Sequence, residues 1–250
     1  KEAISISKKC FDNVFKAITP TAYEYEIESE LTHELIRNGA TRHAFKPIIA
    51  SGKNACIMHY NSNDSICREG SMVLIDFGVC YANYNSDITR CIPVNGIFST
   101  RQRAVYESVL QCLKKGATLL KPGKSFREYE KQMAALIEEE LIKLNLITRK
   151  EIETQLPDQP AYKKYFMHGT AHHLGLDVHD VGHYSGFIEK GMVLTCEPGI
   201  YIPEENLGCR LENNYLITEN GNINLTAAIP IEVDDIETLC KRSKNKMHSA

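Results

Sequence analysis

The sequence lacks several features that would place it in a special class of protein. Its 250 residues include no tryptophan, no Cys-x-x-Cys pair among nine cysteines and no basic excess, since the net charge is −3. No apolar run approaches the roughly 20 residues that a membrane helix needs, so a spanning protein is excluded. Without a strong positive field, nucleic acid and anionic membranes are not expected partners. An odd number of scattered cysteines favours reduced thiols and a cytoplasmic protein.

The pattern of apolar residues predicts an α+β fold with a mainly antiparallel sheet. Hydrophobic residues make up 43% and charged residues 24% of the chain, which is typical of a globular domain. Helical periodicity alternates with short apolar runs that are separated by Gly, Asn and Ser, in the order helices, strands, helices, strands. We expect helices over residues 4–18, 23–38, 100–115 and 126–144, and strands over residues 45–50, 55–60, 72–77, 87–93, 192–195 and 207–218.

Two carboxylates come close together if residues 72–93 form a hairpin. Asp76 ends an apolar run, and a turn at Tyr81-Ala82 would place it directly opposite Asp87, with Cβ atoms about 5 Å apart on one face. Partly buried like charges repel each other, and a cation between them would reverse the sign of that interaction. The pair indicates a metal site, with a hairpin that bears two solvated acids as the alternative.

Histidines gather in a second cluster, which contains His168, His172, His173 and His179. Imidazoles at this density, interleaved with glycines that permit close backbone approach, are not typical of a core. His172 and His173 adjoin, so on an extended segment they point to opposite faces and at most one is expected to be a ligand.

Two further acids, Glu197 and Glu212, lie in strand-like sequence, where a carboxylate is costly to bury without a partner. Arg210 could pair with Glu212 on one strand face, which would explain that acid without a metal. Taken together, four carboxylates and one histidine form a ligand set dominated by hard oxygen. Such a set suits Mn²⁺, Mg²⁺, Co²⁺ or Fe²⁺ better than a thiolate zinc site, and its charge balances two divalent ions.

These segments resemble the five-ligand signature of the dinuclear metallopeptidases with the pita-bread fold, a family that includes methionine aminopeptidases, aminopeptidase P and prolidase. The resemblance extends from the first helices to a last strand near Val233. Residues 175–182 are similar to aminopeptidase P and prolidase, and residues 50–60 and 87–96 resemble aminopeptidase P more closely. Asn213 departs from the second acid that many members carry after the last ligand. The signature itself is read from Ile75-Asp76-Phe77-Gly78, Ser86-Asp87-Ile88-Thr89-Arg90, His168-Gly169 with His172, and Glu197-Pro198-Gly199.

The resemblance implies a role for each of these side chains. Asp76 would bind one metal, Asp87 and Glu212 would bridge two, and a bridging hydroxide would attack the scissile carbonyl. Glu197 would also carry the proton toward the leaving nitrogen. The metal ligands implied are Asp76, Asp87, His172, Glu197 and Glu212. Three histidines would contact substrate and stabilise the oxyanion, namely His59, His168 and His179. His173 and His183 are expected to be structural or peripheral, and Tyr84 and Tyr201 are candidates for a pocket that holds the proline ring.

The activity implied is a metal-dependent aminopeptidase that cleaves the N-terminal Xaa-Pro bond of peptides. The ions would be Mn²⁺ first, with Co²⁺, Fe²⁺ or Zn²⁺ as alternatives. A prolidase, which cleaves only Xaa-Pro dipeptides and needs a cation to grip their free carboxylate, is the nearest alternative. A metal-free binding module of the same fold belongs to a different class. We expect one catalytic domain over residues 1–250 that lacks an upstream domain, since the chain begins at Lys1; the resemblance also allows a homodimer.

Overall fold

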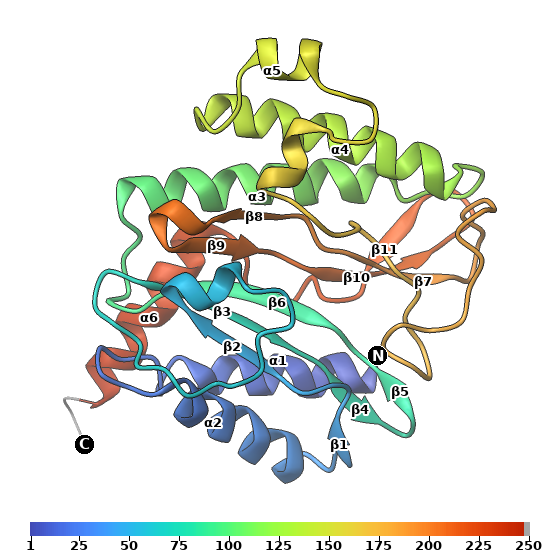
Figure 1. The fold of residues 1–250 in the computed structure, drawn as a ribbon. Helices are drawn as coiled ribbons and strands as arrows, with labels where there is room; N and C mark the ends of the chain where they lie inside the picture. Colours follow the sequence, from blue (N-terminus) through green and yellow to red (C-terminus); the bar gives the residue numbers. More distant parts are fainter. Residues whose placement is uncertain (248–250) are drawn as a thin grey trace.

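Antiparallel strands fill the middle of the molecule, and helices cover them on both sides (Figure 1). This computed structural model describes residues 1–247, with the side chains of residues 1–243, and it confirms the expected α+β organisation. Within residues 1–247, no helix combines the length and the apolar character needed to cross a membrane. The helices are α1 (Glu2–Val14), α2 (Glu24–Arg37), α3 (Thr100–Leu119), α4 (Phe126–Lys143), α5 (Arg149–Thr154) and α6 (Val233–Met247), with 3₁₀ turns η1 (Gly52–Cys56), η2 (Ala161–Lys164) and η3 (Pro203–Glu205).

The strands form small sheets in the orders β2-β3-β6, β1-β4-β5, β11-β10-β7 and β8-β9, and all of their pairs are antiparallel. They are β1 (Arg42–His43), β2 (Ile48–Ser51), β3 (Met72–Phe77), β4 (Val79–Tyr81), β5 (Tyr84–Asn85), β6 (Ile88–Pro93), β7 (Val193–Cys196), β8 (Gly199–Ile202), β9 (Leu207–Arg210), β10 (Asn213–Ile217) and β11 (Asn222–Asn224).

Strands β3 and β6 lie at the centre, and every residue of both is buried. In Figure 1 the helices α1 and α2 lie on one side of the strands, and α3 and α4 lie on the other. A strand covered on both faces needs apolar side chains on both, so β3 reads as a continuous apolar run rather than an alternating one. Asp76 interrupts that run. It therefore lies in the interior of the molecule, paired in register with Ile48 on β2 and with Thr89 on β6.

The four expected helices are present, with ends within four residues of those predicted; α1 ends at Val14 and not at residue 18. Side chains cap the first turns of α3 and α4. Ser99 accepts a hydrogen bond from the backbone N–H of Gln102 at 3.2 Å, and Ser125 accepts one from that of Glu128 at 3.1 Å. A serine in this position satisfies a backbone donor that the first turn leaves without a partner. Helix α3 runs on to Leu119, four residues beyond the expected end.

The expected strand over residues 55–60 is wrong, since the chain forms the 3₁₀ turn η1 and a further turn there. The physical reason is Glu24, a fully buried carboxylate at the start of α2. It accepts hydrogen bonds from Ser51 N at 2.7 Å, Asn54 Nδ2 at 3.0 Å and Tyr60 Oη at 2.7 Å. This side chain satisfies donors of the segment that a neighbouring strand would otherwise have to satisfy.

Three other expected strands differ from the structure. The strand expected over residues 45–50 begins only at Ile48, directly after Pro47. Residues 207–218 form two strands that break at Leu211–Glu212, because β9 pairs with β8 whereas β10 pairs with β7 and β11. Val233 begins helix α6, so no last strand lies there.

The buried Glu24 network predicts a stability defect. Glu24→Gln turns one acceptor oxygen into an amide donor that faces the donors of its neighbours, including the backbone N–H of Ser65 at 3.0 Å. We expect the free energy of unfolding in urea to fall by about 2 kcal/mol, the cost of leaving buried donors unsatisfied. The matched control Glu153→Gln, on the exposed surface of α5, should change it by less than about 0.5 kcal/mol. Equal effects of the two variants would contradict this reading of the network.

Candidate metal centre

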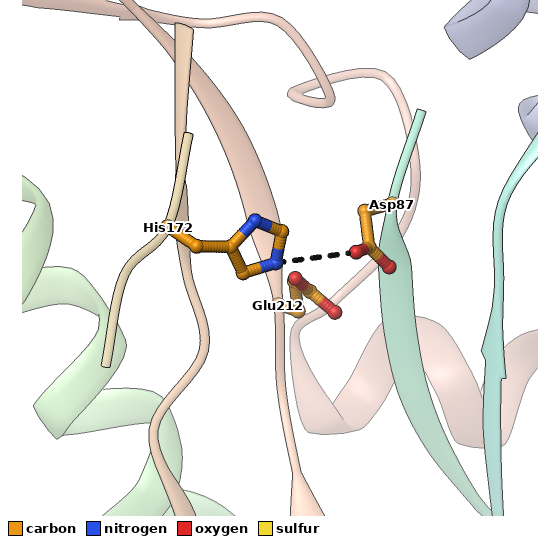
Figure 2. Close-up of side chains that lie close together, drawn as sticks. All are labelled: Asp87, His172 and Glu212. Atoms are coloured by element: carbon orange, nitrogen blue, oxygen red, sulfur yellow. Dashed lines mark ion pairs between the residues drawn. The ribbon is translucent and has the colours of Figure 1, made fainter. Parts of the chain in front are cut away.

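Three side chains from distant parts of the sequence converge in the interior (Figure 2). Asp87 directly precedes β6, His172 lies between η2 and β7, and Glu212 lies between β9 and β10. One ligand atom from each of the three lies within 4.8 Å of the others. His172 Nε2 points toward Asp87 Oδ2 at 3.4 Å. A single cation placed among them could therefore be bound by all three.

The other expected ligands lie at the same place. Glu197 Oε1 is 3.5 Å from His172 Nε2, and Asp76 reaches the centre from β3. All eight residues that the sequence singled out for metal binding or catalysis line one cavity of about 520 Å³. They are Asp76, Asp87, His172, Glu197 and Glu212 together with His59, His168 and His179.

The hairpin that carries Asp76 and Asp87 has a different register from the expected one. Its turn lies at Ala82-Asn83, both of which have positive φ, one residue later than Tyr81-Ala82. Asp76 therefore lies opposite Thr89 and not opposite Asp87. The two acids are diagonal neighbours on one face, with a Cβ separation of about 7 Å rather than about 5 Å. That spacing leaves more room for a cation between the carboxylates.

The carboxylates carry more negative charge than the protein's own donors neutralise. Burial raises the pKa of Asp87 and Glu212, and the neighbouring carboxylates raise it further. Burial likewise raises the pKa of Glu197 to about 8. Among the buried carboxylate oxygens, three have no hydrogen-bond partner within residues 1–243: Asp76 Oδ1, Asp87 Oδ1 and Glu212 Oε1. Each such oxygen costs about 1–3 kcal/mol unless something satisfies it.

Divalent cations would satisfy these oxygens and reverse the repulsion between the acids. The available donors are carboxylate oxygens and one imidazole nitrogen, a set that suits hard or borderline divalent metals. The residues present therefore fit a metal centre of the kind expected from the sequence.

The hydrogen bonds of His172 prepare it as a ligand. Its Nδ1–H donates to the carbonyl oxygen of His173 at 2.9 Å, which leaves the Nε2 lone pair directed at Asp87 and Glu212. Burial lowers the pKa of His172 to about 4, so the ring is neutral at physiological pH. A neutral imidazole whose second nitrogen is held by a carbonyl is the usual form of a metal-binding histidine.

His168 uses both ring nitrogens within the protein. Its Nδ1–H donates to the carbonyl oxygen of Gly169 at 2.7 Å, and its Nε2 accepts from the hydroxyl of Tyr201 at 2.7 Å. Burial lowers the pKa of His168 to about 3. The ring of His179 meets that of His172 edge-on, with centroids 4.5 Å apart. His59 adopts a left-handed backbone conformation with φ of 54°.

The four remaining candidates lie outside the cavity lining, namely His173, His183, Tyr84 and Tyr201. His173 points away from the cavity and packs between Phe126 and Tyr184, and His183 is exposed. Neither Tyr84 nor Tyr201 lines the cavity, so both were wrong as candidates for a proline pocket. Tyr84 is 63% exposed, and Tyr201 is fully buried behind His168. The apolar part of the lining comes instead from Phe45, Ile48, Met58, Ala171 and Val178.

Arg210 is the partner of Asp76 and not of Glu212. Its Nη2 lies 2.5 Å from Asp76 Oδ2, and its Nη1 donates to the hydroxyl of Tyr201 at 2.8 Å. Glu212 Oε2 accepts instead from Thr89 Oγ1 at 2.7 Å. Asp76 and Arg210 are 134 positions apart, so no local pattern in the sequence could have revealed this pair.

A second arginine positions the Glu212 segment and also binds Asn213, the residue that departs from the expected second acid. Arg90 is fully buried, and its Nη1 donates to the carbonyl oxygen of Glu212 at 2.6 Å. Its Nη2 donates to Asn213 Oδ1 at 2.8 Å. The neutral amide oxygen thus provides the acceptor that this guanidinium needs.

Glu130 of α4 holds the segment that carries the cavity histidines. It accepts hydrogen bonds from Thr170 N at 3.1 Å and from Thr170 Oγ1 at 2.8 Å. Thr170 lies between His168 and His172, and its carbonyl oxygen accepts from Glu197 N at 2.9 Å. Sequence reasoning missed Glu130, because its helical position is separated by forty residues from the loop that it binds.

Comparisons with known proteins agree with this geometry. The sequence profile of metallopeptidase family M24 matches residues 1–219. The Xaa-Pro aminopeptidase of Haemophilus influenzae is 45% identical over 232 residues, covering 88% of this chain and 54% of the relative. That of Escherichia coli is 40% identical over 251 residues, covering 96% of this chain and 56% of the relative. The chain thus spans about half the length of these curated relatives.

Solved structures give the same result for the fold. Zinc-substituted aminopeptidase P from Escherichia coli, in complex with product, has a TM-score of 0.90 and 38% identity over 96% of this chain and 57% of that one. This likeness confirms the pita-bread fold expected from the sequence. Because the family profile and the identity to these relatives extend over most of its length, the chain belongs to metallopeptidase family M24.

Proposed function

We propose that this chain is the catalytic domain, over residues 1–250, of a metal-dependent aminopeptidase that cleaves the bond between an N-terminal residue and proline. The observation that carries this proposal is the convergence of four carboxylates and a neutral imidazole on one cavity, where some carboxylate oxygens have no donor among the described side chains. The names of the relatives in Haemophilus influenzae and Escherichia coli support the Xaa-Pro substrate class.

In this proposal Asp76, Asp87, His172, Glu197 and Glu212 hold two divalent ions. Mn²⁺ is the first choice because oxygen donors dominate the set, and Co²⁺, Fe²⁺ and Zn²⁺ are alternatives. When bound, such ions lower the pKa of water and polarise the carbonyl group that it attacks. The acids are positioned for this by strands of the central sheets and by the buried arginines.

Glu197 approaches both His172 and His168 in the cavity. Its Oε1 lies 3.5 Å from His172 Nε2, and its Oε2 lies 3.7 Å from His168 Nδ1. We assign Glu197 the transfer of a proton to the leaving nitrogen. We assign the polar contacts to the substrate carbonyl to His59, His168 and His179, which all line the cavity. The hydrogen bond between His168 and the hydroxyl of Tyr201 orients the His168 ring.

The apolar part of the cavity suits a proline ring. The X-Pro bond has no N–H, so recognition must rely on shape and apolar contact more than on a backbone hydrogen bond. Phe45, Ile48 and Met58 supply such a surface within the same cavity as the acids.

We also place the activity in the cytoplasm, because eight of the nine cysteines are buried and none belongs to a Cys-x-x-Cys pair. The resemblance also allows a homodimer, and the molar mass in solution, measured by light scattering, tests for it.

Matched peptides test the activity directly. With Mn²⁺ present we expect Ala-Pro-Ala to be cleaved after its first residue, and we expect a chelator to abolish cleavage until Mn²⁺ is restored. The reason is that the ions held by the acids lower the pKa of the attacking water and polarise the scissile carbonyl. Release of free alanine measures the reaction, and Ala-Ala-Ala is the control for proline preference.

The alternatives give different results in the same assay. Cleavage of Ala-Pro but not of Ala-Pro-Ala would show a prolidase. Failure to cleave either peptide, together with failure to bind divalent ions in calorimetry, would identify a metal-free binding module and refute the proposal.

Metal binding should stabilise the fold, and Asp87→Asn should separate stability from binding. At a Mn²⁺ concentration about 100 times the dissociation constant, the wild-type free energy of unfolding should rise by about 2.7 kcal/mol. The metal-free variant should be at least as stable as the metal-free wild type, because it removes one of four repelling carboxylates. The free energy of unfolding of the variant should nevertheless rise little when Mn²⁺ is added. A variant that gains as much as the wild type would exclude Asp87 as a ligand.

The contact between Glu130 and Thr170 should tune metal affinity. Glu130→Ala leaves the buried donors of Thr170 unsatisfied and releases the loop, so we expect Mn²⁺ affinity in calorimetry to fall about 10-fold to 100-fold. Glu130→Gln keeps an acceptor oxygen, so its Mn²⁺ affinity should be close to that of the wild type. Glu153→Ala, which alters an exposed acid on α5, is the control. Wild-type affinity in Glu130→Ala would show that the loop keeps its position without this contact.

A further inference from the structure

The cavity has one cationic side chain that the metal centre does not use. Of the lysine and arginine residues that line it, Arg210 is paired with Asp76 and Tyr201. The other is Lys46, an exposed residue at the cavity wall. Within the part of the chain whose side chains are described, its ammonium group makes no hydrogen bond or ion pair. Lys46 is therefore available to an anionic group that enters the cavity.

The backbone on either side of Lys46 is held in place. The carbonyl oxygen of Pro47 accepts from Asn63 Nδ2 at 2.9 Å, and Ile49 N donates to Asn63 Oδ1 at 3.0 Å. On the other side, Ala44 N donates to the carbonyl oxygen of Gly78 at 2.9 Å. The lysine side chain is flexible, but the point from which it extends is fixed by these contacts.

That fixed point lies close to the acids. Ile48 is paired in register with Asp76, and both line the cavity. Lys46 precedes Ile48 by two residues, about 7 Å along an extended chain. Residues two apart on an extended segment share a face, and Lys46 and Ile48 do line the same cavity. Lys46 therefore lines the cavity from a backbone position close to that of Asp76.

We propose that Lys46 recognises a carboxylate of the bound peptide, so that anionic short peptides are preferred substrates. This inference rests on the proposed function, in which the acids and their ions engage the amino end and the scissile carbonyl. The carboxylate has two sources with the same chemistry: the C-terminus of a short peptide, or an acidic side chain at its first residue. Either would find in Lys46 a cation that no described side chain neutralises.

Binding of three peptides that cannot be cleaved tests the proposal without reliance on turnover. In each the scissile amide is reduced to a methyleneamine: Ala-Pro-Ala, its C-terminal amide, and Glu-Pro-Ala amide. Calorimetry on the Mn²⁺-loaded protein gives the ratio of dissociation constants between the neutral peptide and each carboxylate peptide. We expect at least one carboxylate peptide to bind about fivefold more tightly than the neutral one, as for a partly exposed ion pair. The arm that shows the advantage identifies the source of the carboxylate.

Variants decide whether Lys46 causes this advantage. Lys46→Met keeps the length of the side chain and should bring the ratio near one, Lys46→Arg should preserve it, and high salt should reduce it in the wild type. Lys53→Met alters an exposed lysine on η1 outside the cavity lining and should preserve the ratio. A ratio near one in the wild type, or an advantage that persists in Lys46→Met, would overturn the proposal. Failure of the proposed function would show separately, as absence of hydrolysis of the ordinary peptides.

Discussion

Mutual repulsion among three buried carboxylates and a fourth, half-buried one is the constraint on which the rest of the site depends. Asp87, Glu197 and Glu212 all have raised pKa values, with burial as the largest cause. Arg210 neutralises part of the charge through Asp76, and three carboxylate oxygens still lack a donor within residues 1–243. A protein tolerates such an arrangement when a cation completes it, since the same geometry that is unfavourable without the ion binds it tightly.

The surrounding fold holds these charges in place with further buried polar groups. Arg90 donates a hydrogen bond to the backbone carbonyl oxygen of Glu212. Glu130 accepts a hydrogen bond from the backbone N–H of Thr170, which lies in the loop that carries the metal-binding histidine. Glu24 does the same for the loop that leads to His59. In each case one side chain satisfies several donors or acceptors of an irregular segment. Loops that carry functional residues are thereby made as well determined as the strands that they connect.

Much of the fold could be predicted because its signals are local. Helices α2 and α4 follow from apolar periodicity and from capping residues, and β3 follows from an uninterrupted apolar run. The errors arose where distant side chains replaced strand pairing. Residues 55–60 turn because Glu24 binds them, and residues 207–218 break because their two halves pair with different neighbours. A one-residue error in the turn at Ala82-Asn83 likewise changed which residue faces Asp76.

The sequence by itself determined which residue types meet in the site, since four acids and a histidine embedded in apolar or glycine-rich segments carry their chemistry wherever the chain places them. Only the tertiary structure decided their partners: Arg210 with Asp76, Thr89 with Glu212, and the apolar cavity wall in place of Tyr84 and Tyr201. It also placed Lys46 on the same wall. The physical reason is that ionisation, ligand preference and burial cost belong to a residue type, whereas a contact across more than a hundred residues depends on how the sheets and helices pack.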